Sequence, residues 1–166
     1  MFGLKSHIRR QAMAWSFFTL AAFSVQAADN ADVLSASGII KVKSAYSFTE
    51  TVERLKTDVA AKGIRFFQEI DQARLAADAG VAIPPSTLLI FGNPPLGTLF
   101  IKSNPLAGLD WPVRLLVLQN NNGEVWAAYT DFAHIAQRHN ITGKDFESCR
   151  TASGVIASIT SSVATR

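Results

Sequence analysis

The sequence has few of the side chains from which most catalytic and metal sites are built. Cys149 is its single cysteine, so no intramolecular disulfide can form, and we expect it to be a small core residue on a helix. The three histidines, His7, His134 and His139, lack the spacing of a metal-ligand cluster. No glycine-rich loop carries the lysine that a P-loop requires. We therefore expect neither a metal nor a cofactor.

Long apolar runs are also absent. The uncharged segment near the start, residues 11–28, has an apolar core shorter than the roughly 20 residues that a membrane-spanning helix needs. Three basic residues precede it, and Val25-Gln26-Ala27 provides the small residues that signal peptidase recognises. This pattern predicts a signal peptide, with an uncleaved membrane anchor as the alternative.

The predicted signal peptide divides the sequence into three parts. Residues 1–27 are expected to be removed near Ala27, residues 28–36 to form a flexible leader, and residues 37–166 to form a single domain. This organisation predicts a protein that is periplasmic or secreted. No membrane contact is expected beyond the signal segment itself.

A strong excess of charge of one sign is absent after the signal peptide. The whole sequence has a net charge of +3, but three of its sixteen basic residues precede residue 28. The remainder carries thirteen acidic and thirteen basic residues, so its net charge is zero. A neutral surface provides no broad phosphate-binding patch, and we expect no nucleic-acid partner.

The local patterns predict an α+β domain, with a single mixed, largely antiparallel five-stranded sheet packed against helices. An Asn-Gly pair at 122–123 predicts a hairpin between the last two strands. The expected strands are residues 38–44, 64–70, 87–91, 112–118 and 124–129. The expected helices follow Ser47 as far as Gly63, follow Asp71 as far as Ala79, cover 97–102, follow Asp131, and cover 145–163.

The segment from Pro84 to Thr98 is the most distinctive of the chain. Two prolines precede the apolar strand, and Gly92-Asn93-Pro94-Pro95 ends it abruptly. Loops that are fixed at strand ends often carry binding sites. We therefore expect the site of this protein near Asn93.

Several landmarks in the sequence together resemble the domain of unknown function 302 family. The resemblance spans roughly residues 34–139, and its most specific part is Phe91-Gly92-Asn93-Pro94. The other landmarks are Thr51-Val52-Glu53-Arg54-Leu55, Lys62-Gly63-Ile64, Ile70-Asp71, Pro84 to Ile90, Gly97-Thr98, Leu109-Asp110-Trp111-Pro112-Val113-Arg114-Leu115-Leu116-Val117, Gly123-Glu124-Val125-Trp126 and Tyr129. The resemblance implies a compact α+β domain with one sheet, often dimeric, and no established activity.

The sequence departs from this family at one position that bears on chemistry. Family members commonly have a histidine after the aspartate that ends the second strand, whereas here Gln72 follows Asp71. Glutamine is neither a general base nor a good ligand for a transition metal, but its amide can still form hydrogen bonds to a bound molecule. The substitution therefore favours binding over catalysis.

A pocket follows if the second and third strands are neighbours that run the same way. Asp71 and Gln72 would then share one edge of the sheet with Gly92-Asn93-Pro94, and Arg114 would add a cation. Such a set suits a small polar ligand. Each residue also has an ordinary structural role: Asp71 as a helix N-cap, Asn93 in a left-handed turn, and Arg114 paired with Glu124.

Three functional hypotheses remain. The first is a binding or interaction module that holds a small ligand near the Asn93 loop and forms a homodimer. The second is an enzyme with Asp71 as its acid–base group; the third is a structural homodimer whose loop forms the interface. The first is preferred because the sequence shows no paired carboxylates and no nucleophile–base pair, so we assign no catalytic residue.

Overall fold

The computed structural model of the chain describes residues 37–165. The predicted signal peptide, residues 1–27, and the predicted leader, residues 28–36, lie outside the described residues. The described elements follow one another in the order β1 (Ile39–Lys43), α2 (Phe48–Ala61), β2 (Arg65–Asp71), α3 (Gln72–Asp78), β3 (Ser86–Gly92), α4 (Pro94–Ser103), η1 (Pro105–Leu109, a 3₁₀-helix), β4 (Val113–Gln119), β5 (Val125–Thr130), α5 (Phe132–Arg138) and α6 (Gly143–Ser161).

The five strands form one sheet in the order β1-β5-β4-β3-β2. All four neighbouring pairs are antiparallel, and the β2–β3 pair contains an irregularity between Phe66 and Gln68. The predicted fold class is therefore confirmed: the chain is an α+β domain with a five-stranded sheet. The parallel pair that would have made the sheet mixed does not occur among the described strands.

Local sequence signals account for the main helix and the hairpin. Ser47 caps α2, where its side chain accepts a hydrogen bond from the Glu50 amide. Gly63 ends that helix with φ 63°, a conformation that glycine adopts without strain. Gly123 has φ 80° in the turn between β4 and β5, as the Asn-Gly pair predicts.

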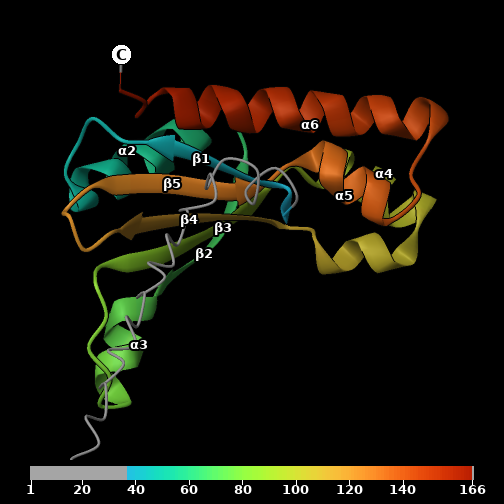
Figure 1. The fold of residues 1–166 in the computed structure, drawn as a ribbon. Helices are drawn as coiled ribbons and strands as arrows, with labels where there is room; N and C mark the ends of the chain where they lie inside the picture. Colours follow the sequence, from blue (N-terminus) through green and yellow to red (C-terminus); the bar gives the residue numbers. More distant parts are fainter. Residues whose placement is uncertain (1–36, 166) are drawn as a thin grey trace, which may run out of the picture.

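Helices α2 and α6 cover one face of the sheet and enclose the core (Figure 1). Strand residues that point into this core, such as Leu89, Leu115 and Val117, have no exposed surface. Leu55 of α2 and Ile159 of α6 are equally buried. The core therefore lies between the sheet and the helices, as expected for a two-layer α+β domain.

The opposite face of the sheet is also apolar, but it is less buried. The strand register places alternate residues of β3, β4 and β5 on this face, because successive side chains in a strand point to opposite sides. Apart from Ala128, which is buried, the central residues are half-buried. We call this surface the open face; its central residues are Leu88, Ile90, Leu116, Leu118, Trp126 and Ala128.

Between residues 37 and 165, none of the helices has the length and apolar character needed to cross a membrane.

Candidate functional site

The loop after β3 is the beginning of helix α4. Asn93 is the N-cap of this helix, and its side-chain Oδ1 accepts a hydrogen bond from the Leu96 amide at 3.3 Å. Pro94 and Pro95 occupy the first two helical positions, where a missing N–H costs nothing. The predicted left-handed turn at Asn93 is wrong, because its φ is −100°. The loop is fixed because a strand ends directly at a capped helix.

Two glycines of this segment make room for an indole ring. A Cβ atom on Gly97 would lie 1.9 Å from Nε1 of Trp111, and one on Gly92 would lie 3.1 Å from the same atom. Phe67 of β2 contacts this indole edge-on, with 6.1 Å between the ring centroids. Close packing against Trp111 therefore explains the two glycines.

A small apolar cavity lies beside the loop. Gly92, Asn93 and Trp111 contribute to its wall, together with Phe100 of α4 and Ile156 of α6. It leaves about 30 Å³ for the centres of water-sized molecules. That volume accommodates about two waters, and almost all of the lining is carbon.

A wider groove adjoins this cavity and opens to solvent. Its volume is about 420 Å³. We call it the Asn93 groove; its residues are Lys62, Ile64, Asn93, Leu96, Thr151, Gly154, Val155 and Ser158. Ile64, Asn93, Leu96 and Val155 also border the cavity, so the two spaces form one stepped site.

The polar groups of the Asn93 groove are largely engaged in contacts within the protein. Lys62 Nζ lies 2.8 Å from Asp58 Oδ2, and Thr151 donates its hydroxyl hydrogen to the Glu147 carbonyl oxygen at 3.0 Å. The first amides of α4 offer little to an anion, because Pro94 and Pro95 have no N–H and the Leu96 amide bonds to Asn93. The site is therefore an apolar pocket with a weakly polar rim.

Asp71 and Gln72 do not belong to this site. In the antiparallel β2–β3 pair, Arg65 lies opposite Gly92 and Asp71 lies opposite Thr87. The expectation that Asp71 and Asn93 share one edge of the sheet is therefore wrong. Six residues of strand separate the two positions, a distance of about 20 Å.

Asp71 and Gln72 have structural partners where they stand. Asp71 caps α3, with Oδ1 accepting a hydrogen bond from the Arg74 amide at 2.9 Å, as expected for an N-cap. Gln72 Oε1 accepts a hydrogen bond from Ser86 Oγ at 2.8 Å. These contacts fix the base of the β2–α3–β3 connection.

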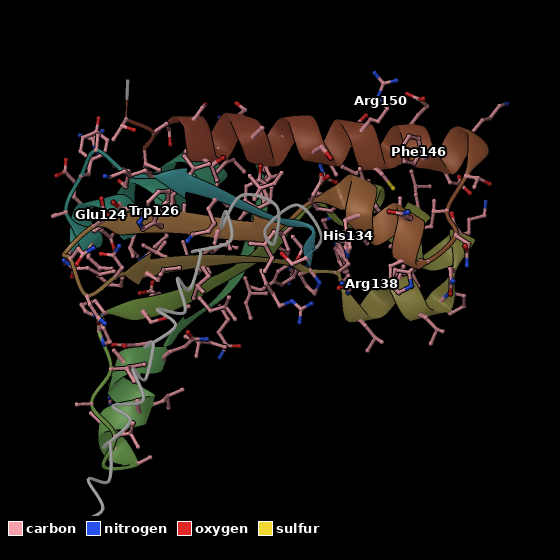
Figure 2. The ribbon with its side chains drawn as sticks, in the orientation of Figure 1. Glu124, Trp126, His134, Arg138, Phe146 and Arg150 are labelled. Carbon is pink, nitrogen blue, oxygen red and sulfur yellow. The ribbon has the colours of Figure 1, made fainter. Side chains whose placement is uncertain are left out.

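Arg114 lines neither the cavity nor the Asn93 groove, and it does not contact the partner considered for it. Its Nη2 donates to the Leu109 carbonyl oxygen at 3.1 Å and lies 3.3 Å from Asp110 Oδ1. Glu124 pairs with Lys43 instead, and this contact lowers the pKa of the Glu124 carboxyl. Arg114 and Arg138 both contact the Asp110 carboxylate. Figure 2 shows Glu124 beside the β4–β5 turn, far from Arg138.

An ionic cluster around the buried Asp110 was not predicted from the sequence. His139 Nε2 lies 2.7 Å from Asp110 Oδ2, and Arg138 Nη1 lies 3.0 Å from Oδ1. Asn104 donates to the His139 carbonyl oxygen at 3.0 Å. His139 ends α5, as predicted from its place in the sequence, but 29 residues separate it from Asp110. No local pattern could have revealed the pair.

The described residues offer little for covalent or metal chemistry. The Asp110–His139 pair is enclosed, with 6% and 7% of the respective side chains exposed. Cys149 is buried as predicted, and burial raises the pKa of its thiol to about 11. Its thiolate, the reactive form, is therefore scarce near neutral pH. Between residues 37 and 165, no group of three or more potential His, Cys, Asp or Glu ligands could hold a metal ion.

Known proteins resemble this chain in fold and in part of the sequence. The structure superimposes with a TM-score of 0.69 on the crystal structure of an uncharacterized conserved DUF302 protein from Bacillus stearothermophilus, at 19% identity. The similarity covers 76% of this chain and 98% of that protein. At this level of identity, the comparison shows the fold alone.

Two Brucella proteins share a segment of 105 residues with this chain at 38% identity. Both are named fluoride-specific ion channel FluC 1, one from Brucella suis and the other from Brucella abortus. The segment is 63% of this chain but only 41% and 39% of those proteins. This chain therefore spans about two fifths of the length of the relatives that it matches.

A comparison of the chain with models of protein families agrees with the sequence motifs and the fold. The family model described as domain of unknown function DUF302 matches residues 40–160, which include every described strand except the first residue of β1. The chain belongs to the DUF302 family.

Proposed function

We propose that this protein is a small-ligand-binding module and that its ligand occupies the Asn93 groove, with an apolar part in the adjoining cavity. The observation that carries this proposal is the continuity of the two spaces, which share Ile64, Asn93, Leu96 and Val155. Binding sites for small molecules are typically concave and apolar, with few polar groups. The proposed compartment remains the periplasm or the cell exterior.

The chemistry of the lining indicates the class of ligand. Aromatic and aliphatic side chains form most of the inner step, whereas Lys62, Thr151 and Ser158 stand only at the outer one. A molecule with a small apolar group for the inner step and a polar group for the outer one would match both. This replaces the purely polar ligand that a pocket containing Asp71 and Arg114 would have favoured.

The enzymatic alternative has less support. Asp71 is exposed and bonded to the backbone of its own helix, so no neighbouring group prepares it for proton transfer. Burial suppresses the nucleophilic form of Cys149. The Brucella comparison also favours a module, since the related segment occurs there within a longer protein.

Binding can be tested with the amphiphilic dye 1-anilinonaphthalene-8-sulfonate, followed by fluorescence titration. Ser158 lies on the exposed side of α6 and lines the Asn93 groove, so Ser158→Trp should fill the groove. We expect this variant to weaken dye binding by about tenfold or more, which corresponds to roughly 1.4 kcal/mol. Ala157→Trp is the matched control, because Ala157 is exposed on the same helix but does not line the groove.

Both variants must keep the wild-type circular dichroism spectrum and melting temperature for the comparison to count. Equal dye affinity in Ser158→Trp and Ala157→Trp would show that the dye binds elsewhere and would refute the proposed site. A selective loss in Ser158→Trp would support it.

A further inference from the structure

We propose that η1 carries a membrane-binding tip, in which Leu106 and Leu109 enter a phospholipid surface and neighbouring basic side chains bind its anionic headgroups. The inference is independent of the ligand of the Asn93 groove. It departs from the sequence-based expectation that only the signal segment contacts a membrane, because the residues concerned lie together only in the folded chain.

The apolar residues of η1 are distributed in the reverse of the usual way. Ala107 belongs to the core and is 1% exposed, whereas Leu106 and Leu109 are 64% and 73% exposed. Within residues 37–165, no other large apolar side chain is as exposed as these two. A 3₁₀-helix has about three residues per turn, so side chains three positions apart lie on the same side. Both leucines therefore project from one side of the segment, and we call this pair the tip.

The position of the tip is fixed by contacts on both sides of it. Figure 1 shows η1, the yellow segment before β4, at the outside of the molecule. Asn104 precedes η1; its Oδ1 accepts a hydrogen bond from the Leu106 amide at 3.0 Å, and its side-chain amide donates to the His139 carbonyl oxygen at 3.0 Å. Asp110 follows η1, and its backbone amide donates to the Ala107 carbonyl oxygen at 3.0 Å. Turning the leucines inward would break these bonds and remove Ala107 from the core.

Basic side chains adjoin the tip. Arg114 Nη2 donates to the Leu109 carbonyl oxygen at 3.1 Å. Arg138, which Figure 2 shows on α5, has its Nη1 3.0 Å from Oδ1 of Asp110, the residue after η1. The two arginine side chains are 52% and 48% exposed, whereas the carboxylate that they share is enclosed, so positive charge remains at the surface. Lys102, exposed in the last turn of α4, adds a third cation and forms no ion pair within the described part of the chain.

A phospholipid surface matches this arrangement better than a protein partner does. A specific protein interface buries roughly 800 Å² on each partner, far more than two leucine side chains supply. Membrane binding requires less, namely a few apolar side chains at the boundary between headgroups and acyl chains, with cations on anionic lipids. The carboxylate of Asp145, at the start of α6, is engaged with Ser103 of α4 at 2.6 Å. A protein in the proposed compartment would meet such a surface.

Binding to vesicles tests the proposal. Protein purified from cells that express the full chain is sedimented with vesicles of phosphatidylcholine, either alone or mixed with an equal amount of phosphatidylglycerol. We expect the wild type to bind the anionic vesicles and Leu106→Asp/Leu109→Asp to bind them about tenfold or more weakly, because the variant loses both apolar groups and adds negative charge. Both leucines are exposed, so the fold should persist. A wild type that does not bind, including one whose tip is covered by another protein, would overturn the proposal.

The matched control is Ala60→Asp/Ala157→Asp, which adds the same two carboxylates at exposed positions of α2 and α6. It should bind the anionic vesicles nearly as tightly as the wild type; an equal loss in both double variants would refute a role of the tip. Lys102→Gln tests the charge and should weaken binding to the anionic vesicles by about fivefold without affecting the neutral ones. Equal affinity of the wild type for both kinds of vesicle would contradict the proposal.

A fluorophore at the tip keeps the test decisive if the aspartate variant is unfolded. Leu106→Cys and, as its control, Ala157→Cys are labelled with the environment-sensitive fluorophore NBD. Cys149 should react slowly, because burial raises the pKa of its thiol to about 11. We expect anionic vesicles to shift the emission of the Leu106→Cys conjugate to shorter wavelength and to leave that of the Ala157→Cys conjugate unchanged. Similar responses of the two conjugates would show that the chain meets the vesicles elsewhere, through residues 11–28 or another surface, and would overturn the proposal.

Discussion

Gly97 lies within helix α4, a position where glycine is normally unfavourable. Glycine is needed there because the indole of Trp111 occupies the space that a side chain would take. Alanine would favour the helix by about 1 kcal/mol, yet a Cβ here would lie 1.9 Å from the indole nitrogen. The loop that the sequence marks as a binding feature is thus also a packing feature. At this scale, one missing methyl group allows Trp111 to form a wall of the apolar cavity.

The variant Gly97→Ala tests this account of the loop. We expect it to lower the free energy of unfolding by about 1–3 kcal/mol, as overpacking does, despite the gain in helix propensity. Gly154→Ala is the matched control in α6, because a Cβ there would meet no atom within 4 Å. It should stabilise the protein by about 0.5–1 kcal/mol in urea unfolding. Similar effects of the two substitutions would contradict the role of Trp111.

At the scale of elements, Asp110 joins the end of α5 to the start of β4. Its carboxylate receives hydrogen bonds from Arg114, Arg138 and His139, which come from two different elements and the residue after α5. A buried carboxylate with these partners is satisfied, but removing it leaves the enclosed His139 ring without this bond. The cluster therefore fixes one end of the sheet relative to the helices.

Asp110→Asn should accordingly cost more stability than the loss of a surface ion pair. We expect a decrease of about 1–3 kcal/mol in the free energy of unfolding, because the bond to the enclosed His139 ring is weakened together with the bonds to the half-exposed Arg114 and Arg138, while the shape is kept. Glu50→Gln, which breaks an exposed pair with Arg54, should change it little. Urea denaturation measures both, and an equal small effect would show that the Asp110 cluster contributes no more than a surface pair.

At the scale of the whole molecule, the sequence predicts a signal peptide before the domain. The basic start, short apolar segment and Ala27 site predict removal of residues 1–27. Intact-mass spectrometry of protein recovered from the periplasm or medium should therefore give a chain that begins at Ala28. Val25→Arg/Ala27→Arg, which removes the small residues at the cleavage site, should leave the precursor uncut. Recovery of the full-length chain from wild-type cells would support the uncleaved anchor instead.

The sequence by itself determined the five strands, most of the helices, the N-cap at Asp71, the hairpin and the burial of Cys149, because each depends on neighbouring residues or on the period of apolar side chains. Helix α4 was expected to start at Gly97, although the capped Asn-Pro-Pro segment begins it at Pro94. That difference is local. If Asn93 had been interpreted as an N-cap followed by prolines, the start of the helix would have been predicted correctly.

Only the tertiary structure decided which strand ends meet. A strand pattern specifies which side chains alternate, but it does not specify whether two neighbouring strands run the same way. The antiparallel β2–β3 pair separates Asp71 from Asn93, and the long-range contacts of Asp110 bring Arg114 to Arg138 and His139. The candidate site therefore includes the loop that the sequence indicated. Side chains of α4 and α6 complete its lining, and the sequence could not indicate them because distant elements meet only when the chain packs around its core.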